Sequence, residues 1–235
     1  EEGMGMNLSY LIFMIPGLLL SLWAQAKVKS AYSKWGQVRN SNNVTGLDTA
    51  IHLKPRVGLE NVTLTSVQGE LTDHYDPRKD TLALSQGVAN TPSVAAMAIT
   101  AHELGHALQD KESYGPMRLR SAIVPLVGLG SNLGIILVMA GLALQMMTLF
   151  NTGIILFSST TIFSLITVPV ELDASKRARV MLAEQGLVRT DEEKRGVDQV
   201  LTAAAWTYVA GLVTSLLQLF YYMSMAGRAS GRRRY

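Results

Sequence analysis

The sequence predicts a mainly α-helical membrane protein with four transmembrane helices and a small α+β domain. Charged residues are absent from three long runs, at residues 3–26, 121–170 and 199–227, although the whole chain of 235 residues has a net charge of +3. The longer polar segment between these runs, residues 27–120, contains short alternating patterns that are typical of β-strands. Hydrophobic residues make up 48% of the chain, which excludes a disordered protein, and the absence of cysteine excludes disulfides and thiolate metal sites.

The first uncharged run predicts a transmembrane anchor at residues 1–26. Its end, Ala24-Gln25-Ala26, has the small residues of a signal-peptidase site, but no basic residue precedes the apolar stretch. Basic residues follow it instead, at Lys27, Lys29, Lys34 and Arg39. We therefore expect an uncleaved helix that continues out of the membrane.

The longer polar segment, residues 27–120, is expected to contain a short helix and a small antiparallel sheet. Residues 45–53 have the cap and the apolar pattern of a helix, which ends before Pro55. Polar and apolar residues alternate at residues 62–67 and again at 81–85, with turn-forming residues between them. We expect these two runs to pair as strands.

The longest uncharged run predicts a membrane hairpin at residues 121–170. Fifty helical residues extend about 75 Å, which is roughly two crossings of a hydrocarbon layer about 30 Å thick. The turn-forming Asn-Thr-Gly sequence at residues 151–153 divides the run. We therefore expect helices near residues 122–148 and 154–170.

Residues 171–198 are expected to form a charged helix with a break near Gly186 and a new start at Asp191, and residues 199–235 a last transmembrane helix with a basic tail. Eleven Lys and Arg residues lie in residues 27–120, and six lie in the charged helix. The positive-inside rule puts both segments on the cytoplasmic face. The four arginines of the tail, which four crossings would place outside, argue against this orientation.

Residues 94–109 predict a helix, capped by Ser93, with an HExxH motif formed by His102, Glu103 and His106. A spacing of four residues sets both imidazoles on one face of the helix, where their nitrogens can converge on one ion. Neutral imidazole suits zinc, which lowers the pKa of a coordinated water and polarises a peptide carbonyl. The adjacent carboxylate of Glu103 can take the proton from that water, so the motif predicts peptide-bond hydrolysis.

A catalytic zinc ion needs a third protein ligand, and without cysteine the candidates are His52, His74 or a carboxylate. Glu171 is favoured because it is the first charged residue after the fifty-residue run. Two membrane crossings would return Glu171 to the face where the HExxH helix lies, whereas one crossing would leave it on the opposite face. The alternative is that Glu171 only marks the membrane boundary.

Three further patterns occur in order along the chain: LTDHYDPR at residues 71–78, AHELGHALQ at residues 101–109 and VPVELDAS at residues 168–175. Together they resemble the YugP-like family of bacterial membrane zinc metallopeptidases, and the likeness extends over most of the chain. Three motifs in order are more specific than HExxH alone. This family in turn resembles the HtpX-like gluzincins, in which a membrane hairpin separates HExxH from a Glu-x-x-Ala ligand motif.

The resemblance implies an integral-membrane zinc endopeptidase with a gluzincin-like metallopeptidase domain and one Zn²⁺ per chain. By this resemblance His102, His106 and Glu171 are the metal ligands, and Glu103 is the general base.

Several other residues are candidates for supporting roles. Ser175 stands where the gluzincins usually have an aspartate, so either Asp173 or Ser175 is expected to contact a ligand histidine. A donor to the oxyanion is expected among His74, Tyr75 and Arg177, with a structural loop as the alternative for the first two. The run before the HExxH helix is a candidate edge strand for an extended peptide substrate, with an ordinary sheet strand as the alternative. Its residues are Thr81, Leu82, Ala83, Leu84 and Ser85.

The expected partners are protein or peptide substrates and the lipid bilayer. The expected location is the bacterial cell membrane, crossed several times, with the active site on the cytoplasmic face. The sequence predicts no nucleic-acid partner, and it leaves open an oligomer or a regulatory membrane partner.

Two other functions stay open as alternatives. An intramembrane protease of the site-2 type would place HExxH inside a span, but Asp110, Lys111 and Glu112 follow the motif closely, and the last spans contain no Leu-Asp-Gly ligand motif. A non-catalytic membrane scaffold or adaptor would use the same ligands for a structural metal site.

Overall fold

The computed structural model describes residues 2–231 and shows a mainly helical chain with one small sheet. Most of the predicted basic tail falls on residues 232–235, outside the described residues. The chain divides into two units by its internal contacts. The helix unit comprises Glu1–Trp23, Leu119–Val168 and Tyr208–Tyr235, and the mixed unit comprises Ala24–Arg118 and Pro169–Thr207.

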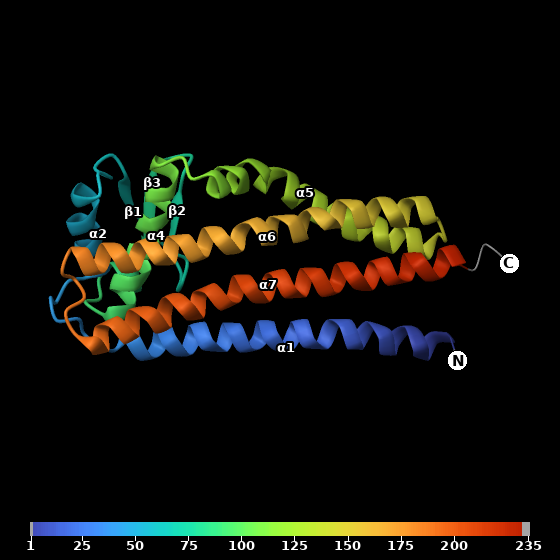
Figure 1. The fold of residues 1–235 in the computed structure, drawn as a ribbon, viewed down its shortest axis with the longest axis horizontal. Coiled ribbons are helices and arrows are strands. Elements are labelled where there is room, and N and C mark those ends of the chain that lie inside the picture. The colour runs from blue at the N-terminus through green and yellow to red at the C-terminus, as the bar shows by residue number, and fades with distance from the viewer. Residues whose placement is uncertain (1, 232–235) are drawn as a thin grey trace. The chain divides into compact units, whose positions relative to one another are not determined.

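Figure 1 labels the helices and strands. Their bounds, in chain order, are α1 (Glu2–Gly36), α2 (Gly46–Leu53), the 3-10 helix η1 (Lys54–Arg56), β1 (Thr63–Val67), β2 (His74–Asp76), β3 (Thr81–Ser85), α3 (Gln86–Ala89), α4 (Val94–Lys111), α5 (Gly115–Ala143), α6 (Met147–Glu184) and α7 (Asp191–Gly231). The four long helices, α1, α5, α6 and α7, contribute residues to both units.

Three helices among the described residues are long and apolar enough to cross a membrane, namely Tyr10–Gly36, Met147–Glu184 and Asp191–Gly227. A fourth crossing requires the two parts of α5, Gly115–Pro125 and Gly130–Ala143, which are bent by 51°, to act as one span. Large apolar side chains on these helices are exposed, such as Ile155 at 70%. This exposure suits a surface that contacts lipid.

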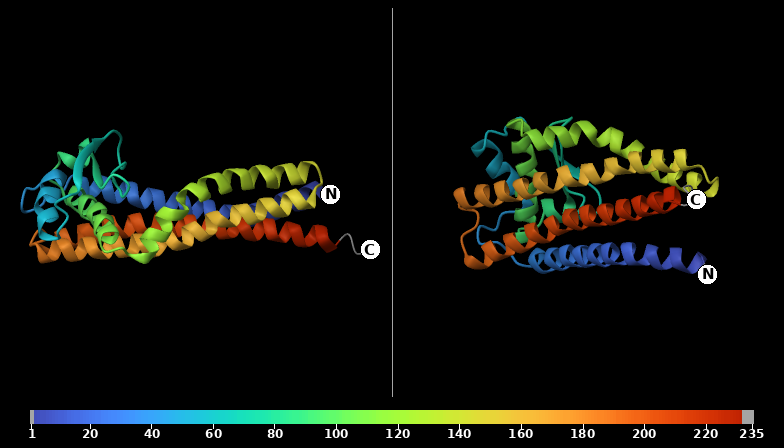
Figure 2. Two further views of the ribbon diagram at one scale, coloured as in Figure 1. Left: turned by 90° about the horizontal axis from the view of Figure 1, so that it is seen from above. Right: turned by 45° about the vertical axis from the view of Figure 1, so that its right-hand side comes forward.

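The turn of the predicted membrane hairpin lies at residues 144–146, so its expected position at residues 151–153 was wrong. Gly153 lies inside α6, where a Cβ atom would come within 2.6 Å of the backbone nitrogen of Val138 in α5. The glycine therefore lets two helix backbones pack closely instead of ending a helix. Figures 1 and 2 show α5 and α6 side by side next to their connecting turn.

Both helices predicted in the polar segment are present, and each begins at a side-chain cap. Before α2, Thr45 Oγ1 accepts a hydrogen bond from the Asp48 N–H at 3.0 Å, and the Asp48 carboxylate accepts one from the Thr45 N–H at 2.9 Å. Before α4, Ser93 Oγ accepts a hydrogen bond from the Ala96 N–H at 3.1 Å. These caps satisfy backbone donors that the first helical turn leaves free.

The sheet has three strands in the order β1-β3-β2, and it is mixed rather than antiparallel as predicted. β1 pairs with β3 in parallel, from Thr63 opposite Thr81 to Val67 opposite Ser85. The unpredicted strand β2 pairs with β3 in antiparallel register, because residues 77–80 turn the chain back directly. Strand β2 has only three residues, too few to show periodicity in the sequence. Because β2 occupies one side of β3, β1 pairs with the other side.

Strand β3 is central, so of the two readings of residues 81–85 the structure agrees with an ordinary sheet strand and not with an edge strand. Its backbone pairs with β1 over residues 81–85 and with β2 over residues 81–83. The residues concerned are Thr81, Leu82, Ala83, Leu84 and Ser85. Because β1 pairs along the whole strand, β2 pairs with its first three residues and four of its five side chains are buried, its alternating pattern reflects packing in the core.

The sheet, α4 and the end of α6 share one hydrophobic core in the mixed unit. Leu82 and Leu84 of β3, Met97 and Leu104 of α4 and Leu182 of α6 all belong to it, and each is at most 1% exposed. This core holds α4 between the sheet and α6.

The charged segment after the hairpin breaks and restarts as predicted. Helix α6 ends at Glu184, Gly186 adopts a φ of +63°, and α7 starts at Asp191. A positive φ favours glycine and commonly ends a helix. The Glu193 carboxylate accepts hydrogen bonds from the backbone N–H groups of Arg189 and Thr190, at 2.7 and 3.0 Å, which caps the start of α7.

Candidate metal centre

Helix α4 presents His102 and His106 on one buried face, as their spacing predicts. The two residues are 8% and 7% exposed, and their ring centroids are 4.8 Å apart. Ala95, Ala98 and Ala101 on the same helix are fully buried. Their small side chains allow α4 to lie within the core and so bury the two imidazoles.

Glu171 of α6 lies against both imidazoles and is 1% exposed. Its Oε2 atom is 3.1 Å from His102 Nε2 and 3.3 Å from His106 Nε2. Burial would lower the pKa of His106, but the hydrogen bond and the charge of Glu171 outweigh burial and raise it. The space between these side chains therefore favours a positive charge, which a proton or a metal ion can supply.

The three side chains fit a zinc ion. Each offers one ligand atom, and these atoms all lie within 4.8 Å of one another. In a tetrahedral site with ligands about 2.0–2.1 Å from zinc, neighbouring ligand atoms are roughly 3.3–3.4 Å apart. The separations of 3.1 and 3.3 Å are close to this value. Two imidazoles and one carboxylate form a ligand set that zinc enzymes use and that leaves a fourth position open.

Gly105 explains how α6 can approach the two histidines. A Cβ atom at residue 105 would lie 2.6 Å from the backbone oxygen of Ala174 and 3.2 Å from its Cα atom. Both are backbone atoms, which cannot rotate away. Glycine between the two histidines therefore allows α4 to cross α6 one turn from Glu171.

Glu103 is held by the main chain of strand β2. Its Oε2 atom accepts a hydrogen bond from the Tyr75 N–H at 3.0 Å. Burial raises the pKa of Glu103, the two neighbouring histidines lower it in part, and the carboxylates of Glu171 and Asp73 raise it further. Sequence reasoning missed this backbone donor, because a main-chain N–H has no side chain to indicate its role.

The side chain of Tyr75 is directed to two other carboxylates. Its hydroxyl lies 2.9 Å from Asp80 Oδ1 and 3.0 Å from Asp110 Oδ2. Burial and these two carboxylates raise the pKa of Tyr75 far above its ordinary value. The structure therefore brings the Tyr75 backbone to the site, while its hydroxyl fastens β2 to the end of α4.

The two histidines considered as further ligands lie outside the group of three. His52 is on α2, and His74 is an exposed residue of β2 whose Nδ1 atom is 2.8 Å from the carbonyl oxygen of Thr72. The group of potential ligand atoms contains Glu171 instead.

Ser175 contacts His102 directly, and Asp173 is connected to His106 through Gln109. Ser175 Oγ is 3.1 Å from His102 Nδ1. Asp173 Oδ2 accepts a hydrogen bond from Gln109 Nε2 at 2.9 Å, and Gln109 Oε1 lies 3.0 Å from His106 Nδ1. Gln109 lies one turn after His106, a spacing that brings the two side chains together on one face of α4.

Arg177, a candidate donor to the oxyanion, forms two ion pairs. Its Nε atom is 2.6 Å from Asp173 Oδ2, and its Nη1 atom is 2.6 Å from Glu112 Oε2. The pair with Asp173 lies within α6, and the pair with Glu112 ties the end of α4 to α6. The structure does not bring the guanidinium group to the three ligand atoms.

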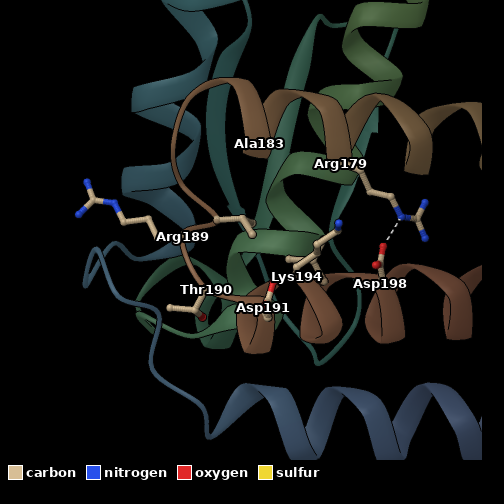
Figure 3. A pocket seen from close by; sticks show the side chains of 9 residues that line it. Arg179, Ala183, Arg189, Thr190, Asp191, Lys194 and Asp198 are labelled. Atoms are coloured by element: carbon tan, nitrogen blue, oxygen red, sulfur yellow. Dashed lines mark hydrogen bonds and ion pairs between the residues drawn. The ribbon is translucent and has the colours of Figure 1, made fainter.

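A separate pocket lies in the mixed unit where α6 turns into α7 (Figure 3). Arg179 of α6 and Asp198 of α7 point toward each other across it, with 2.6 Å between Arg179 Nε and Asp198 Oδ1. Residues of both charges line the pocket, and none is a predicted site residue. Its lining residues are Arg179, Ala183, Val188, Arg189, Thr190, Asp191, Lys194, Val197 and Asp198.

Comparisons with known proteins show the family of the chain. A family model described as "Putative neutral zinc metallopeptidase" matches residues 10–227. The chain is 42% identical over 214 residues to "Putative membrane protease YugP" of Bacillus subtilis (strain 168), which covers 91% of this chain and 95% of that protein. No solved structure matches the chain. The match over nearly the whole chain shows that this protein belongs to the family described as "Putative neutral zinc metallopeptidase".

Proposed function

We propose that this protein is an integral-membrane zinc endopeptidase that hydrolyses protein or peptide substrates. In this proposal His102, His106 and Glu171 hold one zinc ion per chain, and Glu103 is the general base. The observation that supports it most directly is the approach of two imidazole Nε2 atoms to one carboxylate oxygen, at 3.1 and 3.3 Å.

The residues of the site divide the reaction between them. Bound zinc would supply an activated water and a polarised peptide carbonyl. The Glu103 carboxylate takes the proton from the attacking water and gives it to the leaving amine nitrogen. The Tyr75 N–H restrains the carboxylate next to the ligands while it does so.

The ligand histidines need oriented rings as well as free Nε2 atoms. Ser175 supplies this support to His102, at the position where an aspartate is usual in the gluzincins. The group of two histidines and a later glutamate supports a gluzincin-like domain. In this proposal residues 27–120 are the peptidase segment, and residues 171–198 are the segment of the third ligand.

The proposed membrane arrangement has four spans. The segment at residues 1–26 is the anchor, residues 121–170 form the hairpin, and residues 199–235 contain the last span and the basic tail. Support comes from the three apolar helices and from the bent helix α5 as a fourth. The Lys and Arg residues of the two polar segments favour a cytoplasmic metal centre in a multi-pass bacterial membrane protein.

The test of the proposed chemistry is the variant Glu103→Gln in the full-length protein. We expect it to keep the bound zinc of the wild type and to lose cleavage of an unstructured casein-like substrate by about 10²–10⁴-fold, the usual contribution of a general base. Bound zinc is measured by elemental analysis, and cleavage by release of peptides.

Glu60→Gln is the matched control, because Glu60 is exposed and lies between η1 and β1. We expect this control to have full activity. Full activity in Glu103→Gln would rule out the role assigned to Glu103.

A further inference from the structure

Gln109 occupies a central place next to the metal centre. Its side chain is completely buried and makes three polar contacts. The Oε1 atom is 3.0 Å from His106 Nδ1, and the Nε2 atom donates to the carbonyl oxygen of Val170 at 2.8 Å and to Asp173 Oδ2 at 2.9 Å. A buried amide with all these partners is held in a single orientation.

The orientation of the amide follows from its partners. The backbone carbonyl of Val170 accepts hydrogen bonds and cannot donate one. The same is true of the Asp173 carboxylate, which is ionised in its pair with Arg177. The NH₂ group of Gln109 must therefore face these two oxygens. Turning the amide over would place its oxygen against two acceptor oxygens, where it could make no hydrogen bond.

This orientation fixes the proton on His106. With the Gln109 oxygen facing Nδ1, Nδ1 must bear the hydrogen and donate it. A neutral His106 then has its lone pair on Nε2, the atom that lies 3.3 Å from Glu171 Oε2. Only this tautomer can bind a metal ion at Nε2.

His102 has no equivalent constraint from its own partner. The Ser175 hydroxyl at 3.1 Å from His102 Nδ1 can either donate or accept, so this contact is compatible with both tautomers. Gln109 also reaches the backbone of Val170, the residue before Glu171. One amide thus connects a ligand histidine on α4 to the turn of α6 that bears the third ligand.

We propose that Gln109 is a positioning residue of the metal centre, which holds His106 with its proton on Nδ1 and fastens it to the helix of Glu171. The inference rests on the proposed function, because it concerns how the chain prepares for zinc. Histidine ligands are often oriented by a carboxylate. Here the neutral amide of Gln109 orients His106. The Asp173 carboxylate contacts Gln109 instead of the histidine, and Arg177 balances its charge.

The test compares the zinc dissociation constants of full-length variants, measured by competition with a chelator. Gln109→Glu keeps the acceptor for His106 but puts a carboxylate oxygen against Val170 and Asp173. We expect zinc binding to weaken by about 10–100-fold, the usual effect of removing an orienting partner. Gln109→Leu removes the acceptor and should weaken binding to a similar extent.

Reversing the polarity of the pair provides a rescue. Adding Asp173→Asn to Gln109→Glu supplies an amide donor opposite the new carboxylate, so we expect most of the lost zinc affinity to return. The absorption spectrum of the cobalt-substituted protein should change in Gln109→Glu and return toward the wild type in the double variant. Two controls carry the same substitutions elsewhere. Gln37→Glu changes an exposed residue, and Asp198→Asn changes a residue of the separate pocket. Both should bind zinc like the wild type.

Three results would overturn the inference. One is a zinc dissociation constant in Gln109→Glu equal to that of the wild type. Another is a double variant that binds zinc no more tightly than Gln109→Glu. The third is a lower melting temperature of the zinc-free variants with unchanged zinc affinity, which would show a role in stability alone. If Gln109→Leu does not fold, Gln109→Glu and the double variant still decide the question.

The inference and the proposed function fail in different ways. A wild type without bound zinc would contradict both. A wild type that binds zinc and loses activity in Glu103→Gln, together with Gln109 variants of normal zinc affinity, would contradict the inference alone.

Discussion

At the scale of single residues, the candidate metal centre depends on a glycine as well as on the three residues that offer ligand atoms. Gly105 lies between His102 and His106, against the backbone of Ala174. The contact it permits determines how near the α6 backbone comes to the two imidazoles. The separation of the two imidazoles from Glu171 is therefore set by backbone packing, and their orientation is set by hydrogen bonds.

Gly105→Ala tests this role of the glycine. The added Cβ atom would lie 2.6 Å from the Ala174 oxygen, so α4 and α6 must move apart. We expect the free energy of unfolding to fall by about 1–3 kcal/mol, as for other overpacked cores. Zinc affinity should fall by about 10-fold or more, since the ligands separate. Thermal denaturation and chelator competition measure the two effects.

Gly115→Ala is the control for this variant, because a Cβ atom at residue 115 would have no neighbour within 4 Å. We expect Gly115→Ala to bind zinc like the wild type. Wild-type zinc affinity in Gly105→Ala would show that the helix contact does not set the ligand geometry.

At the scale of helices and strands, Tyr75 joins β2 to α4 at two points. Its N–H binds the Glu103 carboxylate, and its hydroxyl contacts Asp110, seven residues later on the same helix, as well as Asp80. Seven residues are about two helical turns, so the two contacts lie on one face of α4. The strand is thus fixed along the helix that bears the HExxH motif.

Tyr75→Phe separates the two contacts, because it keeps the N–H and removes the hydroxyl. We expect the free energy of unfolding to fall by about 1–3 kcal/mol, since Asp80 and Asp110 lose a shared donor in a partly buried place. Zinc content should stay normal, and peptide cleavage should fall far less than in Glu103→Gln. A variant with normal zinc content and stability, but as inactive as Glu103→Gln, would mean that the hydroxyl takes part in the reaction.

The sequence predicted elements that depend on local interactions and failed on those that depend on distant ones. Helix α4 and its Ser93 cap are determined within a few residues, and both were predicted. Strand β2 has only three residues. Strands β1 and β3 pair in parallel although β2 and its turns lie between them in the chain. Neither feature leaves a periodic pattern in the sequence, so the sheet was predicted as antiparallel, and an edge position of β3 was left open beside an ordinary sheet strand.

At the scale of the whole molecule, the candidate metal centre joins residues that are 69 positions apart, His102 and Glu171. The uncharged run between them forms the greater part of α5 and the first part of α6. The sequence indicated that a double crossing returns Glu171 to the histidines, because the run is long enough for two helices. It could not locate the turn, since Gly153 resembles a turn residue but packs against α5.

Labelling of introduced cysteines tests the number of crossings and the orientation. The chain has no cysteine of its own, so each variant contains a single reactive thiol. Glu60→Cys lies in the mixed unit, and Leu144→Cys lies in the turn between α5 and α6, where Leu144 is 63% exposed. We expect a membrane-impermeant maleimide to label Leu144→Cys in intact cells and Glu60→Cys only after the membrane is opened.

Reaction of both thiols from the same face would show that α5 does not cross the membrane. The reverse pattern would place the metal centre outside the cell and would agree with the four arginines near the C-terminus.

The central claim is that Glu171 completes the zinc site with His102 and His106, and zinc content measures it most directly. Three full-length proteins are compared: the wild type, Glu171→Ala and the control Glu184→Ala. Glu184 is exposed and lies at the end of α6. Each protein is purified in the presence of zinc, freed of loosely bound metal and analysed for zinc per chain. We predict one zinc ion per chain in the wild type and in Glu184→Ala, and a large loss in Glu171→Ala. Wild-type zinc content in Glu171→Ala would contradict the site described here.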